Sequence, residues 1–239
     1  MSKHLKRLAA PRSLSIKRKI AKWTIKPSPG PHPADRCIPL GIIVRDMLSL
    51  CDNRKEAKKI IGSGEILVDG KPRKDLKFPC GLMDVISIPK LDKSYRILFD
   101  KKGRLILVPI EGDEENWKLC LIKNKTTLKG NRRQLNLHDG RNIIVEEDKF
   151  KTGDTIKLSF RDNKIIDVYP MEKGTTALIT GGSHIGEVAK IESIEIRRSF
   201  QPNMVTLMRE DKKFSTIKDY VFPIGRDAPA ITLPEVKAV

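Results

Sequence analysis

From Lys90 onward, apolar residues recur at every second position in short runs that turn signals separate. Such alternation is typical of strands with one buried face. The segments YRILFDKKGRLILVPI, LNLHDGRNIIVEED and DTIKLSFRDNKIIDVYP each predict a strand, a turn and a strand, so we expect a β-rich central domain over residues 91–170. Four further runs, from TALIT to FSTIKDYVFPI, predict a small β-barrel over 171–227, and a surface tail follows over 228–239.

Residues 37–90 show a different pattern, with helical spacing first and strands after it. The apolar residues before Asn53 fall on one face of a helix. Asn53, with Glu56 three residues later, predicts a capping box at the start of a second helix, which Gly62 ends. EILVDGKPRKDL then predicts a strand and a hairpin-type turn, and GLMDVISI predicts a closing strand. We expect a two-helix module with a small sheet here, and an α+β, multi-domain fold for the chain.

Positive charge is concentrated at the start of the chain. The net charge is +17, and residues 1–36 alone carry ten Lys or Arg against one acid. The four prolines from Pro27 to Pro33 disfavour a helix and favour an extended path. We therefore expect an extended basic arm that binds a polyanion. We also expect the arm to be disordered in the free protein, because its small apolar surface cannot offset its ordering entropy.

Two polyanions fit this charge, nucleic acid and an anionic membrane. No apolar run approaches the ~18 to 20 residues that a spanning helix needs, and the start of the chain lacks the apolar stretch of a signal peptide. A basic helix at a membrane surface over residues 3–10 stays open as an alternative. Nucleic acid is the better fit.

The cysteines and histidines show no metal-ligand spacing. No C-x-x-C pair and no H-x-x-x-H pair occurs. The expected state is four reduced thiols in small cores of a cytosolic protein, with no metal and no cofactor: Cys37, Cys51, Cys80 and Cys120.

The second helix of the module carries an unfavourable charge pattern. Arg54 and Lys58 are four residues apart on one face, where like charges cost roughly 0.2 to 0.5 kcal/mol. Arg54 and Lys55 also stand where the helix dipole disfavours cations. A phosphate at the helix N-terminus, bound by free backbone N–H groups and these cations, would offset that cost. The alternative is a solvated basic face, but GKPRKD brings further cations to the next hairpin turn.

The module resembles the S4-type RNA-binding module, whose pattern is a helix, a basic R-x-E-A helix and a G-x-V-x-V-N-G strand and turn. The matching residues are Arg54, Glu56 and Ala57, then Gly64, Ile66, Val68, Asp69 and Gly70. Asp69 replaces the more usual Asn, and either residue accepts a positive φ. The resemblance implies that the basic helix and the surrounding loops lie on folded RNA.

A second resemblance lies in GTTALITGGSHIGEVAKIESI, residues 174–194, which is similar to the KOW motif of ribosomal and elongation proteins. The HIG within it lies between β-patterned runs and not at the start of a Rossmann helix, so a nucleotide site is disfavoured. The order of all segments, from KHLKRLAAPRS to the KOW-like turn, resembles the S4e family of small-subunit ribosomal proteins. The end soon after ITLP favours an archaeal type.

The S4e resemblance implies a structural, non-enzymatic, cytoplasmic protein of the small ribosomal subunit. Its expected partners are small-subunit rRNA and neighbouring ribosomal proteins, with no membrane and no small-molecule substrate. Trp23 is a candidate for stacking on a base, and His32 is expected to make local hydrogen bonds. The predicted RNA-binding residues are Lys3, His4, Lys6, Arg7, Arg12, Lys17, Arg18 and Lys19 in the arm, and Arg54, Lys55, Lys58, Lys59, Lys71, Arg73 and Lys74 in the module.

Two other functions stay open at this point. An RNA-modifying enzyme would need a catalytic constellation, and the candidate acids stand in turn or strand contexts that explain them: Asp69, Asp75, Asp84 and Asp139. A regulatory factor that holds a protein partner through the KOW-like barrel is the second alternative.

Overall fold

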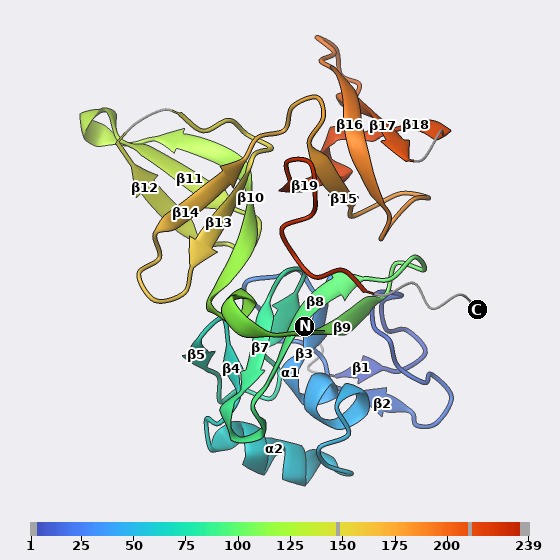
Figure 1. Cartoon of the computed structure of the whole chain (residues 1–239). Coiled ribbons are helices and arrows are strands. Elements are labelled where there is room, and N and C mark those ends of the chain that lie inside the picture. Colours follow the sequence, from blue (N-terminus) through green and yellow to red (C-terminus); the bar gives the residue numbers. More distant parts are fainter. Residues whose placement is uncertain (1–3, 147–148, 210–211, 235–239) are drawn as a thin grey trace. The chain divides into compact units, whose positions relative to one another are not determined.

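The computed structural model describes residues 4–146, 149–209 and 212–234. It separates into two units (Figure 1). The first comprises Met1–Phe99 with Arg104–Lys118, and the second comprises Asp100–Gly103 with Leu119–Val239.

The first unit is built on an antiparallel five-stranded sheet in the order β5-β4-β7-β8-β9. Its strands are β4 (Leu67–Val68), β5 (Lys71–Pro72), β7 (Val85–Ile88), β8 (Lys93–Phe99) and β9 (Leu105–Ile110). Two small two-stranded ladders accompany it, β1 (Leu5–Lys6) with β2 (Trp23–Thr24) and β3 (Cys37–Pro39) with β6 (Pro79–Gly81).

The two predicted helices are present in this unit. The first is α1 (Leu40–Ile42), which continues as a π-helical turn over Ile43–Met47, and the second is α2 (Arg54–Gly62). Leu40, Ile42, Ile43 and Val44 of the first helix are fully buried, whereas Met47 at its end is half-buried. Short 3-10 turns lie at Pro89–Leu91 and Gly112–Asn116.

The structure moves one predicted boundary. We expected the central domain to begin at residue 91, but β8 and β9 pair with β7 and complete the module's sheet. Sheet edges are stabilised by further pairing, and both strands bury their inward residues in this unit. The first unit therefore extends to Lys118, the second residue of β10.

The N-terminal segment is folded onto the first unit, which corrects the expectation of an extended, disordered arm. Leu14 and Ile25 are buried. Gly41 makes room for Ile25, because a Cβ on that glycine would lie 2.8 Å from Ile25 Cδ1. The backbone N–H of Leu105 donates to Ser13 O at 2.9 Å. These few apolar anchors and backbone bonds order a segment that its charge suggested was disordered.

The second unit holds two antiparallel five-stranded sheets. The first, in the order β12-β11-β10-β13-β14, contains β10 (Trp117–Thr127), β11 (Arg133–Leu137), β12 (Asn142–Val145), β13 (Thr155–Ser159) and β14 (Ile165–Tyr169). The second, in the order β18-β17-β16-β15-β19, contains β15 (Thr176–Ile179), β16 (Val188–Glu195), β17 (Met204–Arg209), β18 (Lys212–Ile217) and β19 (Val221–Gly225). Further 3-10 turns lie at Lys129–Asn131 and Lys218–Tyr220.

Each of these sheets has its own small core, as the low apolar content predicts. One contains Cys120, Ile122, Leu135, Leu137, Ile156 and Leu158. The other contains Met171, Ala177, Ile179, Ala189, Ile191, Val205, Leu207 and Val221. The predicted hairpins are confirmed, including the turn at Asp139 and Gly140 between β11 and β12. Among the described residues, no helix is long and apolar enough to cross a membrane.

Candidate nucleic-acid interface

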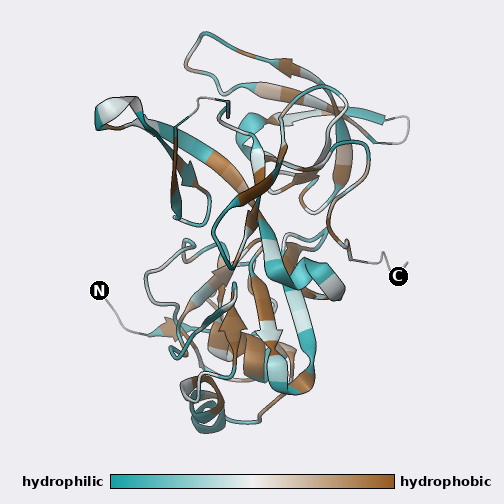
Figure 2. Ribbon diagram, turned by 60° about the vertical axis from the view of Figure 1, so that its left-hand side comes forward, coloured by the Kyte–Doolittle hydropathy of each residue, from teal (hydrophilic) through white to brown (hydrophobic). Residues whose placement is uncertain are grey.

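The α2 helix presents a basic face to solvent. Ala57 and Ile61 point inward and are buried, which leaves the remaining positions of its first two turns outside. Figure 2 shows this helix as mostly hydrophilic beside the hydrophobic strands of the sheet. The exposed cations are Arg54, Lys55, Lys58 and Lys59.

The N-terminus of α2 is capped by the protein itself. Asn53 Oδ1 accepts from the backbone N–H groups of Lys55 at 2.9 Å and Glu56 at 3.0 Å. Glu56 Oε2 accepts from the N–H of Asn53 at 3.3 Å, which completes the predicted capping box. This corrects the expectation that a phosphate is held by free N–H groups at this helix end. The attraction for an anion rests on the four side chains.

The hairpin after α2 adds cations next to the helix. Asp69 and Gly70 have φ of 52° and 71°, the geometry of a tight β4–β5 turn. Lys71 and Lys74 are exposed on it. Lys74 lies beside the end of α2, because a Cβ on Gly64 would come 3.1 Å from its Cε.

Arg73 differs from its neighbours in being half-buried. Its guanidinium carbon lies 4.5 Å from the centre of the Phe78 ring. This cation–π contact fixes the side chain at the edge of the basic face.

The N-terminal segment contains a second group of exposed cations. Trp23 is 46% exposed, with the His4 ring 4.9 Å away edge-on and Lys22 Nζ 5.2 Å from the ring centre. A half-exposed aromatic ring among cations is typical of a nucleic-acid surface. Lys3 lies outside the described residues, and the other exposed predicted residues are His4, Lys6, Arg12, Lys17 and Lys19.

Two predicted RNA-binding arginines have structural partners instead. Arg7 is buried, and its Nη2 lies 3.4 Å from Asp46 Oδ2. Arg18 donates to the backbone carbonyls of Leu8, Ala10 and Pro11 at 3.3, 2.6 and 2.8 Å. Both guanidinium groups therefore hold the N-terminal segment in shape. Charge alone could not separate them from the exposed cations.

A buried charge network lies behind the hairpin turn. Lys118 Nζ contacts Asp69 Oδ2 at 2.7 Å and Asp84 Oδ1 at 2.9 Å. His32 Nε2 lies 2.9 Å from Asp84 Oδ2, so the predicted hydrogen-bonding histidine pairs with a distant residue and not a local one. Burial by itself raises the pKa of Asp84, but Lys118 and His32 outweigh burial and hold it well below the usual range.

A second buried cation fixes the end of this unit. The Arg96 guanidinium donates to Glu114 Oε2 and to the carbonyl oxygens of Glu114 and Trp117, the latter two at 3.0 and 3.2 Å. Its central carbon lies 4.8 Å from the Trp117 ring centre. Burial lowers the pKa of Arg96. Sequence analysis missed Arg96 and Lys118, although a lone cation within an alternating strand pattern was a usable signal.

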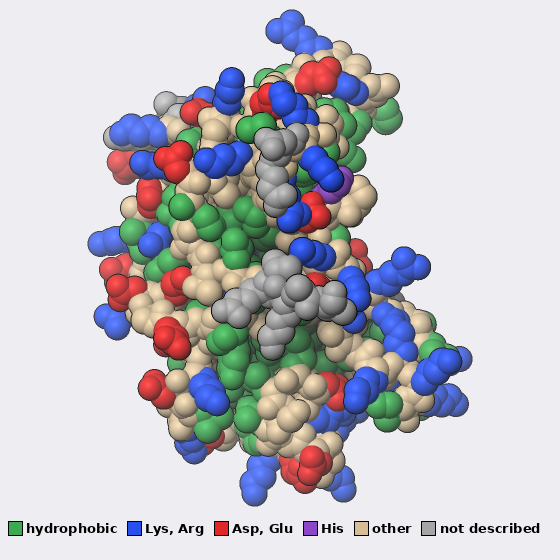
Figure 3. Space-filling view, turned by 45° about the vertical axis from the view of Figure 1, so that its right-hand side comes forward, with side chains coloured by type: hydrophobic (Ala, Val, Ile, Leu, Met, Phe, Trp, Pro, Cys, Tyr) green, Lys and Arg blue, Asp and Glu red, His purple; other side chains and the backbone are tan. Residues whose placement is uncertain are grey.

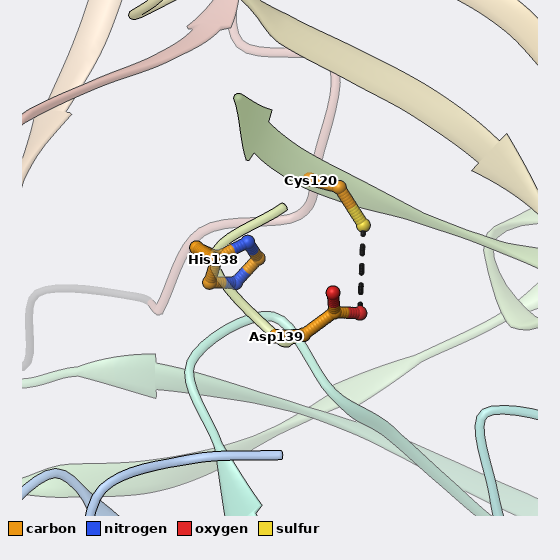
Figure 4. A group of neighbouring side chains, drawn as sticks. All are labelled: Cys120, His138 and Asp139. Carbon is orange, nitrogen blue, oxygen red and sulfur yellow. Dashed lines mark hydrogen bonds between the residues drawn. The ribbon is translucent and has the colours of Figure 1, made fainter. Parts of the chain in front are cut away.

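The described part of the second unit contains one group of side chains of metal-ligand type, Cys120, His138 and Asp139, whose ligand atoms lie within 4.8 Å of one another (Figure 4). Each makes a protein contact. Cys120 Sγ lies 3.8 Å from Asp139 Oδ2, and the Leu121 N–H donates to His138 Nδ1 at 3.2 Å. Arg141 Nε lies 3.3 Å from Asp139 Oδ2. This arrangement links β10 to the turn between β11 and β12. Cys120 and His138 are 18 positions apart, which hid the group from sequence motifs.

Together, a basic two-helix module and an array of small β-sheets define an RNA-binding protein of the ribosomal class. Three family models match the chain: the RS4NT domain at residues 1–35, the S4 domain at 43–86 and ribosomal family S4e at 91–165. The small ribosomal subunit protein eS4 of Methanothermobacter thermautotrophicus is 53% identical over 97% of this chain and 96% of its own length. That of Methanocaldococcus jannaschii is 52% identical over 97% of both chains.

A solved structure agrees with these relatives. The crystal structure of the 30S ribosomal protein S4e from Thermoplasma acidophilum has a TM-score of 0.71 and 38% identity, covering 80% of this chain and 96% of that one. The chain belongs to the S4e family of ribosomal proteins. The findings support neither the RNA-modifying enzyme nor the regulatory factor.

Proposed function

We propose that this chain is a structural constituent of the small ribosomal subunit that binds folded rRNA and supports subunit assembly. The observation that carries the proposal is the α2 helix. It directs four cations to solvent while its buried side packs against α1 and the π-helical turn. Such a face suits phosphates at fixed spacing, and RNA folded into a junction supplies them.

The N-terminal segment supplies the second part of this surface. Its exposed cations and the half-exposed Trp23 stand on a folded scaffold, so less ordering entropy is lost on binding than for a disordered arm. Figure 3 shows Lys and Arg side chains spread over the surface, with Asp and Glu side chains among them. Neutralising phosphates with such cations gives a salt-dependent affinity.

The proposed role is non-enzymatic, needs no cofactor and places the protein with rRNA and neighbouring ribosomal proteins in the cytoplasm. We propose that the chain has five parts: the N-terminal segment, the two-helix module, the central β domain, the barrel and the C-terminal tail. The module also includes β8 and β9. For residues 171–227 we propose a small SH3-like KOW barrel. Its support is the sheet order, in which β15 pairs with both β16 and the last strand, β19.

The salt dependence of rRNA binding tests this proposal. We expect the double variant Arg54→Ala with Lys58→Ala to weaken binding to small-subunit rRNA and to flatten the slope of log K against log salt by roughly one unit per lost phosphate contact. The charge-preserving pair Arg54→Lys with Lys58→Arg is the matched control and should keep the slope. Equal binding by wild type and the alanine pair at every salt concentration would refute the role of α2.

A further inference from the structure

The loop between β16 and β17, residues 196–203, carries two large apolar side chains in full contact with solvent. Phe200 has a relative exposure of 107%, as in an extended peptide, and Ile196 is 73% exposed. The loop forms the tip at the top of the view in Figure 1. Isolated exposed apolar residues are common on monomers, but two within one short loop indicate a contact surface when the loop is ordered.

Hydrogen bonds within the loop hold it in one conformation. The Arg197 guanidinium donates to both carboxylate oxygens of Glu195 at 3.2 Å and to Gln201 Oε1 at 3.0 Å, so it bridges the two sides of the loop. The backbone N–H of Arg197 donates to Asn203 Oδ1 at 2.9 Å. The Lys218 N–H donates to Asn203 O at 2.8 Å, which ties the loop's base to the following turn. The exposed Phe200 ring is thus carried by a loop that internal hydrogen bonds stabilise.

The charge around Phe200 favours RNA over an apolar pocket on a protein. The sequence IRRSFQPN contains two arginines and no acid. Glu195 neutralises Arg197, whereas Arg198 is exposed two positions before Phe200. An aromatic face next to a cation matches an unpaired base and its phosphate.

We propose that the β16–β17 loop is a second RNA contact of this chain, in which Phe200 stacks on an unpaired base and Arg198 contacts a neighbouring phosphate. The proposal rests on the rRNA-binding function proposed above, and it adds a site that lies in the second unit. Stacking by Phe200 and charge pairing by Arg198 should depend differently on salt concentration. Loss of the ring should lower affinity at every salt concentration, while loss of Arg198 should also flatten the salt slope.

The test measures binding of the full chain to protein-free small-subunit rRNA. We expect Phe200→Ala to weaken binding roughly 5- to 100-fold, the range for one stacked base. Phe200→Trp should retain affinity, while Phe200→Leu, which is apolar without an aromatic face, should lose most of it. Ile166→Ala, at an exposed apolar position of β14, is the matched control and should bind as wild type.

Three results would overturn the proposal, and each is separable from failure of the main function. If the α2 double variant loses affinity while Phe200→Ala binds as wild type, the rRNA function stands and the loop contact falls. If Phe200→Ala binds free rRNA normally but enters reconstituted subunits poorly, the loop docks on a protein. If Phe200→Leu binds as well as wild type, an apolar contact replaces stacking. A wild-type chain that does not bind rRNA would refute the main function itself.

Discussion

Lys118 Nζ lies 2.7 Å from Asp69 Oδ2, and the two residues are 49 positions apart in the chain. Asp69 has a positive φ in the β4–β5 turn, and its Oδ1 also accepts from the Val85 N–H at 3.1 Å. The contact therefore ties the turn beside the proposed RNA surface to the start of β10. It also explains the Asp at a turn position where Asn is more usual, since a carboxylate can neutralise the buried ammonium.

Replacing Lys118 should strongly destabilise the first unit. Its side chain is 1% exposed and neutralises two buried carboxylates. Lys118→Met removes the ammonium that Asp69 and Asp84 share, while His32 still contacts Asp84. We expect a loss of about 3 to 5 kcal/mol in the free energy of unfolding. Tryptophan fluorescence during urea unfolding reports this unit selectively, because both tryptophans, Trp23 and Trp117, belong to it.

The matched control for that measurement is Lys93→Met, at an exposed lysine of β8 in the same unit. It should change the free energy of unfolding by no more than about 0.5 kcal/mol. Equal effects of the two substitutions would show that the buried pairing contributes no stability.

Acid should unfold the first unit through Asp84. The pKa of this carboxyl is depressed in the folded state, because Lys118 and His32 outweigh the effect of burial. A depressed pKa contributes stability that is present above the unfolded value of about 4 and is lost as pH falls below it. We expect tryptophan fluorescence to show loss of structure between about pH 4 and 2. Asp84→Asn should flatten this dependence, while Asp113→Asn, at an exposed acid, should leave it steep.

Local sequence signals predicted much of this fold. The Asn53 to Glu56 spacing gave the capping box, and the period-two runs gave the hairpins, because both depend on neighbours a few residues apart. The pairing of β8 with β7 was missed, since an alternating strand does not show which sheet it joins.

The same limit applied to the candidate site. Positive charge identified the exposed cations of α2, but it could not show that Arg7 reaches Asp46, 39 positions away. The sequence also did not identify Phe200 as a contact residue, because the hydrophobicity of one residue does not show whether it is buried. Whether such side chains are buried or exposed depends on contacts with residues that are distant in sequence.

The cysteine thiols should differ in reactivity. Burial, followed by Asp35 and Asp84, raises the pKa of Cys37 to about 12. Burial also raises the pKa of Cys80 well above its ordinary value. Burial raises the pKa of Cys51 as well, but Cys51 is half-buried whereas the other three thiols are buried. Since the thiolate is the reactive form and must be reached by the reagent, N-ethylmaleimide at pH 8 should first modify Cys51. Peptide mass spectrometry locates the label. Native Cys37 or Cys80 reacting as fast as Cys51 would contradict the assignment, and in urea all should react.

Substitutions of Arg7 and Arg12 should have different effects, the first on folding stability and the second on RNA binding. Arg7 is buried against Asp46, whereas Arg12 is exposed. Arg7→Ala removes a buried guanidinium and one of the two arginines that contact Asp46, the other being Arg45. We expect a loss of about 1 to 3 kcal/mol in the free energy of unfolding. Arg12→Ala should change stability by less than about 0.5 kcal/mol and flatten the salt slope of rRNA binding by about one unit. Urea unfolding and rRNA titrations on both variants give the comparison. If Arg7→Ala kept full stability and lost only RNA affinity, Arg7 would be a phosphate contact and its pairing with Asp46 incidental.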